Sequence, residues 1–137
     1  MFDGTEVNIF AVAVVWIFYM VVGAFWYSPA GFAAKWTKYT GIDIMKIPTD
    51  KATKILVSVA ASCLVQAVTL GFVIQSLGAS TVFEGLSAGL VLWFGLTAAT
   101  TVGVTLYSQR SWKFLWLNAA YFLVVMSIGS IILAIWQ

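Results

Sequence analysis

Residues 8–36, NIFAVAVVWIFYMVVGAFWYSPAGFAAKW, decide the fold class of this chain. The run from Val7 to Ala34 carries no charge. About 20 apolar residues, each adding about 1.5 Å, let an α-helix cross ~30 Å of hydrocarbon. Residues 8–27 are therefore predicted to form a membrane-spanning helix. Pro29 is expected to end this helix, because proline disfavours the helical conformation of the residue before it.

The composition of the whole chain agrees with this interpretation. Of its 137 residues, 62% are hydrophobic and 9% are charged, whereas soluble domains carry about a quarter of charged residues. The length suits one compact bundle, without an appended soluble domain. We therefore predict an all-α membrane protein with a single domain, a bundle of four transmembrane helices with a short interfacial helix after the first.

Three further spans are predicted at residues 55–77, 85–107 and 114–136, where apolar runs of sufficient length recur. Thr49 or Asp50 is expected to cap the second span, since either side chain can accept hydrogen bonds from the free N–H groups of a new helix.

Residues 30–41 are predicted to form the short interfacial helix on the cytoplasmic surface, and Gly41 is its expected end. Aromatic residues recur at helical spacing on one side of this segment: Phe32, Trp36 and Tyr39. Lys35 and Lys38 are expected to reach toward the other side. An irregular loop with its rings in the headgroup layer remains the alternative.

All basic residues fall at one end of the predicted bundle, in two connections. They are Lys35, Lys38, Lys46, Lys51, Lys54, Arg110 and Lys113. The other end carries Asp3, Glu6 and Glu84. Basic residues in short loops resist translocation, so we predict an inner (plasma) membrane protein with cytoplasmic basic loops and both termini outside. The lipid bilayer is its expected environment, and a net charge of +2 gives no argument for nucleic acid.

Several residues form a pattern that is typical of a family. They are Asn8, Tyr19-Met20, Gly23, Trp26-Tyr27-Ser28-Pro29, Phe32 and Lys35-Trp36, followed by Asn118 and Tyr121 in the last span. With this length and three further spans, the chain resembles a bacterial family of small membrane proteins catalogued as domain of unknown function 1761. The resemblance covers nearly the whole chain and implies no established activity.

Two spans carry distinctive stripes. On the second span, polar residues fall within an arc of about 80°: Ser58, Ser62, Gln66, Thr69 and Ser76. We expect this stripe to face protein rather than lipid. On the third span, small residues fall within about 120°: Gly85, Ala88, Gly89, Gly95, Ala99 and Gly103. Small residues allow close helix packing, against another span or another copy, so this span is predicted to be the most enclosed.

Polar or amphipathic residues from all four spans are expected at one depth, in the cytoplasmic half of the bundle. They are Tyr19, Trp26, Ser62, Thr101, Asn118 and Tyr121. These residues are candidates for a cleft that binds a neutral or lipid-like molecule, because clefts between helices often hold ligands. The alternative is that Asn118 and Tyr121 only satisfy a bend or a neighbouring carbonyl.

The chain lacks the residues on which most membrane chemistry depends. It has no histidine and one cysteine, Cys63. Apart from Cys63 and the tyrosines, every ionisable group lies outside the predicted spans, whereas ion-coupled carriers place charges within them. We expect no catalytic residue, cofactor or metal site. Three functions stay open: a non-enzymatic bundle that self-associates or joins a larger membrane complex, a binding or transport protein for a small molecule, and an accessory subunit of a membrane enzyme.

Overall fold

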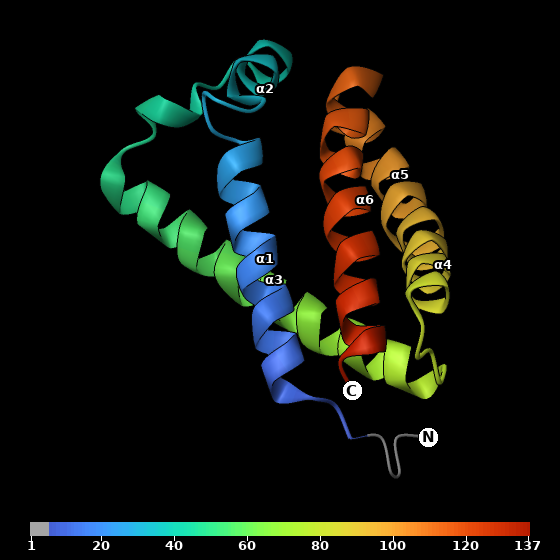
Figure 1. Ribbon diagram of the computed structural model, residues 1–137. Helices are drawn as coiled ribbons and strands as arrows, with labels where there is room; N and C mark the ends of the chain where they lie inside the picture. The colour runs from blue at the N-terminus through green and yellow to red at the C-terminus, as the bar shows by residue number, and fades with distance from the viewer. Residues whose placement is uncertain (1–5) are drawn as a thin grey trace.

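Residues 6–137 are described by a computed structural model, in which they fold into helices joined by short turns (Figure 1). Residues 1–5, which include Asp3, lie outside this described part. Four helical stretches are long and apolar enough to cross a membrane: Ile9–Trp26, Thr49–Ser76, Val82–Tyr107 and Trp112–Ile135. The predicted class, an all-α membrane protein with four spans, is therefore confirmed.

The first span, α1 (Ile9–Trp26), begins and ends at local signals. Asn8 is its N-cap, and the side-chain oxygen accepts hydrogen bonds from two backbone N–H groups of the first turn. Pro29 follows the last turn, as predicted. The chain then reverses so tightly that a Cβ atom at Gly31 would collide with the carbonyl oxygen of Phe25. Glycine has no Cβ and permits this approach.

The helix α2 (Ala33–Thr40) follows this turn and lies across the end of α1 (Figure 1). It begins later than the predicted segment 30–41, because the residues directly after Pro29 form turns. Gly41 ends it with a φ of 73°, in the left-handed region that glycine adopts without strain. A short 3₁₀ helix, η1 (Ile44–Lys46), leads on to the second span.

The second span, α3 (Thr49–Ser76), begins before the predicted boundary at residue 55. Pro48 is the N-cap residue, and no side chain caps the helix. The prediction that Thr49 or Asp50 would be the cap is therefore wrong. Pro48 has a φ of −55° and a ψ of 142°, which suits the position before a helix, so that Thr49 becomes the first helical residue. Asp50 lies in the first turn, where a negative charge is favourable.

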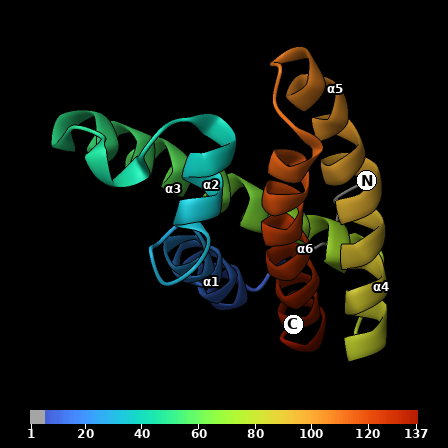
Figure 2. The ribbon, with the colours of Figure 1, turned by 90° about the horizontal axis from the view of Figure 1, so that it is seen from above.

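The first half of α3 projects beyond the rest of the bundle (Figures 1 and 2). No residue from Thr49 to Ser62 is buried. The buried residues all lie in the second half, where α3 crosses α1 and α6: Cys63, Ala67, Leu70, Gly71 and Ile74. One contact reaches back to the first half, since the indole Nε1 of Trp16 donates a hydrogen bond to the carbonyl oxygen of Ala60 (2.9 Å).

The third span is not a continuous α-helix. It consists of α4 (Val82–Leu92), a π-helical turn η2 (Trp93–Ala98) and α5 (Ala99–Tyr107). Thr81 caps α4, because its hydroxyl oxygen accepts from the N–H of Glu84, whose carboxylate accepts from the N–H of Thr81. A π-helical turn holds about one more residue than an α-helical turn, so the face that α5 presents is displaced relative to α4.

The last span, α6 (Trp112–Ile135), lies between α1 on one side and α4 with α5 on the other (Figures 1 and 2). In its most apolar window 44% of the residues are buried, compared with 17% in the third span. The prediction that the third span is the most enclosed is therefore wrong. The third span packs mainly against α6, whereas α6 contacts α1, α3 and α4 at once.

Candidate functional site

Aromatic side chains join the last turn of α1 to the first half of α6. The ring of Tyr121 lies 6.2 Å from that of Trp26 and 5.8 Å from that of Tyr27, measured between centroids. Trp26 also contacts Phe32 of the turn before α2, at 4.6 Å. We call Tyr19, Trp26, Tyr27, Asn118 and Tyr121 the inner cluster.

Hydrogen bonds hold the inner cluster together. The hydroxyl of Tyr121 donates to the carbonyl oxygen of Tyr19 (2.9 Å), and that of Tyr27 donates to Oδ1 of Asn118 (2.7 Å). The indole Nε1 of Trp26 donates to the carbonyl oxygen of Leu117 (3.2 Å). Nδ2 of Asn118 donates to the carbonyl oxygen of the residue one turn earlier in α6. These polar groups therefore satisfy one another between α1 and α6.

The structure brings together four of the six residues expected to line a cleft: Tyr19, Trp26, Asn118 and Tyr121. Ser62 is exposed on α3, and the hydroxyl of Thr101 donates to a carbonyl of its own span, that of Ala98 at the end of η2 (2.9 Å). Tyr19 is only 1% exposed and Tyr121 only 6%. This is the arrangement of the alternative interpretation, in which the polar groups satisfy neighbouring carbonyls. The depth of a residue along its span can be predicted from the sequence, but the direction in which its side chain points cannot.

Tyr27 belongs to the inner cluster but was not among the predicted cleft residues. It is the C-cap of α1, with a φ of −96° and a ψ of 16°. Helical periodicity does not apply at this position, because the backbone has left the helix. The sequence signal that points to Tyr27 is the adjacent Ser28-Pro29, which marks the bend.

Two hollows lie at opposite ends of the bundle. The first, of about 400 Å³, lies between α2 and the start of α6, and we call it the α2–α6 groove. Its lining residues are Trp26, Phe32, Lys35, Tyr39, Lys113, Trp116, Leu117 and Ala120. Of the six predicted cleft residues, Trp26 is the one that lines this groove.

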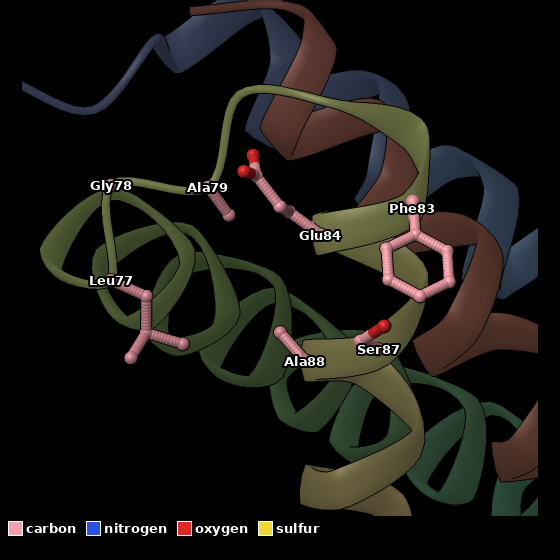
Figure 3. Close-up of a pocket in the computed structure, with 7 residues that line it drawn as sticks. All are labelled: Leu77, Gly78, Ala79, Phe83, Glu84, Ser87 and Ala88. Carbon is pink, nitrogen blue, oxygen red and sulfur yellow. The ribbon is translucent and has the colours of Figure 1, made fainter.

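The second hollow, of about 290 Å³, lies at the turn between α3 and α4 (Figure 3). Its lining residues are Leu77, Gly78, Ala79, Phe83, Glu84, Ser87 and Ala88. The carboxylate of Glu84 points back to the turn and accepts hydrogen bonds from the N–H groups of Ser80 (2.8 Å) and Thr81 (3.1 Å). It therefore serves the end of the helix rather than a ligand.

Arg110 connects the two basic loops. Its Nη1 donates to the carbonyl oxygen of Thr40 (2.9 Å), at the C-terminal end of α2, where a positive charge is favourable. Its guanidinium also lies 6.0 Å from the ring centroid of Phe114, whose ring contacts Trp36. These contacts hold α2 against the first turn of α6.

The predicted small face of the third span is divided by the π-helical turn. Gly85 and Gly89 pack against α6, so closely that a Cβ atom on either would lie 2.8 Å from an atom of Ser130. A Cβ atom at Gly95 or Gly103 would meet nothing within 4 Å. Ala99 is exposed as well, whereas Ala98 and Thr105 are buried. The prediction that Gly95, Ala99 and Gly103 pack with Gly85 and Gly89 is therefore wrong, because the extra residue turns them away.

The predicted polar stripe of α3 points away from the bundle. Ser58, Ser62, Thr69 and Ser76 are exposed and Gln66 is partly exposed. The centre of the stripe lies roughly 140° around the axis from the buried face of α3, at about 100° per residue. The expectation that the stripe faces protein is therefore not met within one chain.

Over the part of the chain that the structure describes, no three His, Cys, Asp or Glu side chains could hold a metal ion together. The family model described as Protein of unknown function (DUF1761) matches residues 10–134. No curated protein and no solved structure matches the chain.

Proposed function

This chain belongs to the DUF1761 family of proteins of unknown function, and from its packing we propose that it is a non-enzymatic membrane protein that associates with a second copy of itself. The observation that carries this proposal is the direction of the polar stripe of α3. A membrane helix that carries polar groups on its outer face is stabilised when another helix covers that face.

Gln66 is the residue of the stripe whose side chain would gain most from a hydrogen-bonding partner on another helix. It is the middle residue of the predicted span 55–77, and its carboxamide has two donor hydrogens and an acceptor oxygen. Among residues 6–137 its side chain has no hydrogen-bond partner. An unpaired polar group costs several kcal/mol in hydrocarbon. The Gln66 carboxamides of two crossing α3 helices can satisfy each other.

The hydroxyl groups of the stripe depend less on a second helix, because they can donate hydrogen bonds within their own helix. The Oγ of Ser58 donates to the carbonyl oxygen of Lys54 in its own helix (2.9 Å). Ser62 and Thr69 lie one turn before and after Gln66 and can extend a pairing that Gln66 centres. The stripe is open to an identical helix along both halves of α3, since Ser62 and Thr69 are exposed and Gln66 is partly exposed.

The same packing supports an orientation in the membrane. α2 and the turn between α5 and α6 lie at one end of the bundle, and the last turn of α6 lies at the other (Figure 1). Basic residues of short loops stay in the cytoplasm. The protein therefore spans the inner (plasma) membrane with α2 in the cytoplasm and both termini outside.

Cysteine labelling tests this orientation. In a chain with Cys63 replaced by alanine, Lys46→Cys will react with an impermeant maleimide only after the membrane is opened. Ser80→Cys will react in intact cells, because Ser80 lies at the opposite end and is exposed. Labelling in the reverse order contradicts the proposed orientation.

Native mass spectrometry of gently extracted protein tests the association. We expect the parent at twice the mass of one chain. Gln66→Leu will weaken the association about tenfold, because it removes interhelical hydrogen bonds from both copies. Gln75→Leu is the matched control, since Gln75 lies on the same helix but outside the polar stripe.

Other outcomes count against the proposal. Equal weakening by Gln66→Leu and Gln75→Leu would mean that the stripe has no special role. A parent that carries a different membrane protein in place of a second copy would point to a larger complex, or to an accessory subunit of a membrane enzyme.

A further inference from the structure

The α2–α6 groove has features that neither the bundle nor its self-association requires. It is about 400 Å³ in volume, within the range of about 300 to 1,000 Å³ that small-molecule sites occupy. Two separate elements supply its charges, Lys35 from α2 and Lys113 from α6. It lies apart from the exposed stripe of α3 and does not overlap it.

Within residues 6–137, the two ammonium groups of the groove have no anionic partner. No carboxylate lines the groove. Among the described residues, the one lysine within 4 Å of a carboxylate is Lys46, which pairs with Asp43 (3.5 Å). Nζ of Lys35 lies 5.5 Å from the ring centroid of Phe32, on the groove side of α2. The spacing had predicted that Lys35 would point to the opposite side from the aromatic residues. A groove with two cationic groups and no anion is complementary to a negatively charged ligand.

The groove changes in character along α6. Lys113 lies in the first turn of α6, one turn before Leu117, whose carbonyl oxygen accepts the hydrogen bond from Trp26 at the end of α1. Leu117 and Ala120 lie farther along the same wall, and Ala120 is about 10 Å deeper than Lys113 at 1.5 Å per residue. The groove is therefore cationic at the membrane surface and apolar toward the hydrocarbon. That sequence of surfaces matches an amphiphile with an anionic head.

We propose that the α2–α6 groove binds one anionic phospholipid, with its headgroup phosphate between Lys35 and Lys113 and one acyl chain against Leu117 and Ala120. The headgroup of a zwitterionic lipid also carries a positive charge, which the two lysines repel, so such a lipid is expected to bind more weakly. A free phosphate ion leaves the apolar wall uncovered.

Both walls of the groove are held in place without the lipid. The hydrogen bond from Arg110 to Thr40 fixes the end of α2, and that from Trp26 to Leu117 fixes α1 against α6. A site whose walls are already ordered loses little conformational freedom on binding.

Native mass spectrometry with added lipid tests the proposal on the full chain. The probes are phosphatidylglycerol, phosphatidylcholine with the same acyl chains, and inorganic phosphate. We expect one tightly retained phosphatidylglycerol per chain. The double variant Lys35→Gln, Lys113→Gln will retain it roughly 30-fold more weakly, given the effect of a lysine on an anionic membrane lipid. The matched control is Lys51→Gln, Lys54→Gln, which removes the same charge from the start of α3.

A second variant separates the groove from general surface charge. Ala120→Phe keeps every charge but fills the apolar wall, so we expect it to weaken phosphatidylglycerol retention by roughly tenfold while phosphate binding stays absent. The helical circular dichroism and elution volume of each variant check that it is folded. Equal effects of the two lysine pairs, equal retention of phosphatidylcholine, or saturable binding of inorganic phosphate alone would each overturn the proposal.

Discussion

Replacing Gly89 by leucine will prevent the chain from folding into a bundle that elutes as a single species. A Cβ atom at Gly89 would lie 2.8 Å from Oγ of Ser130 and 2.9 Å from the carbonyl oxygen of Met126. Backbone atoms of α6 cannot move aside cheaply, and overpacking by fewer atoms already costs about 1 to 3 kcal/mol. Leucine adds three further carbons, and whole domains are stable by only about 5 to 15 kcal/mol. Size-exclusion chromatography of the detergent extract measures this loss.

Gly103→Leu is the matched control for Gly89→Leu. The same atoms are added on the same span, but a Cβ atom at Gly103 meets nothing within 4 Å. Gly103→Leu will therefore elute as the parent does, and so will Ala99→Leu. Normal elution of Gly89→Leu would contradict the close contact between α4 and α6. Disruption by Gly103→Leu would show that α5 packs against another molecule.

Replacing Tyr121 by alanine will lower the free energy of unfolding by about 3 to 5 kcal/mol, the usual cost of deleting a buried aromatic ring. The ring of Tyr121 contacts Trp26, Tyr27 and Phe122, and its hydroxyl bonds the backbone of Tyr19. Its loss therefore loosens the joint between α1 and α6. Thermal unfolding followed by circular dichroism, in one detergent for all variants, measures the change.

Tyr121→Phe distinguishes the ring from its hydroxyl. It removes the hydrogen bond to Tyr19 but keeps the packing, so the expected loss is about 1 kcal/mol. A loss as large as that of Tyr121→Ala would assign the stability to the hydroxyl. Unfolding of both variants at the parent temperature would mean that the inner cluster does not hold α1 to α6.

The sequence was sufficient to predict the class and number of spans, because the signals are local. A run without charge, a proline such as Pro29 and a glycine such as Gly41 each act within a few residues of where they stand. Helix ends that depend on competition between neighbours were less predictable. At the start of α3 the N-cap is Pro48, whereas Thr49 and Asp50, which can also serve as N-caps, lie within the first turn.

Faces of helices were predicted less well than their positions. Periodicity identifies residues that share one side of a helix, but it does not say what that side meets. The α3 stripe of Ser62, Gln66 and Thr69 was correctly grouped, yet it points away from its own chain. On the third span the grouping itself failed after residue 92, because periodicity assumes 3.6 residues per turn throughout and η2 departs from it.

For the candidate cleft, too, the height of each residue along its span was predicted better than the direction of its side chain. Asn118 and Tyr121 were placed at the right height relative to Tyr19 and Trp26, and these four residues meet. Ser62 and Thr101 share that predicted height but lie on other helices, whose tilt and rotation depend on contacts between distant parts of the chain. No local pattern in the sequence encodes those contacts.

The π-helical turn also has a consequence for how the gene can change. A π-helical turn accommodates about one residue more than an α-helical turn, so the residues beyond it lie where they would in a regular helix that is one residue shorter. Loss of a single codon within Trp93–Ala98 would therefore convert η2 into an α-helical turn and leave Ala99 and Gly103 facing outward, as they do now. In a regular α-helix the same deletion would rotate every residue beyond it by about 100°. The π-helical turn is thus a place where the gene can lose a codon without changing the surface that α5 presents.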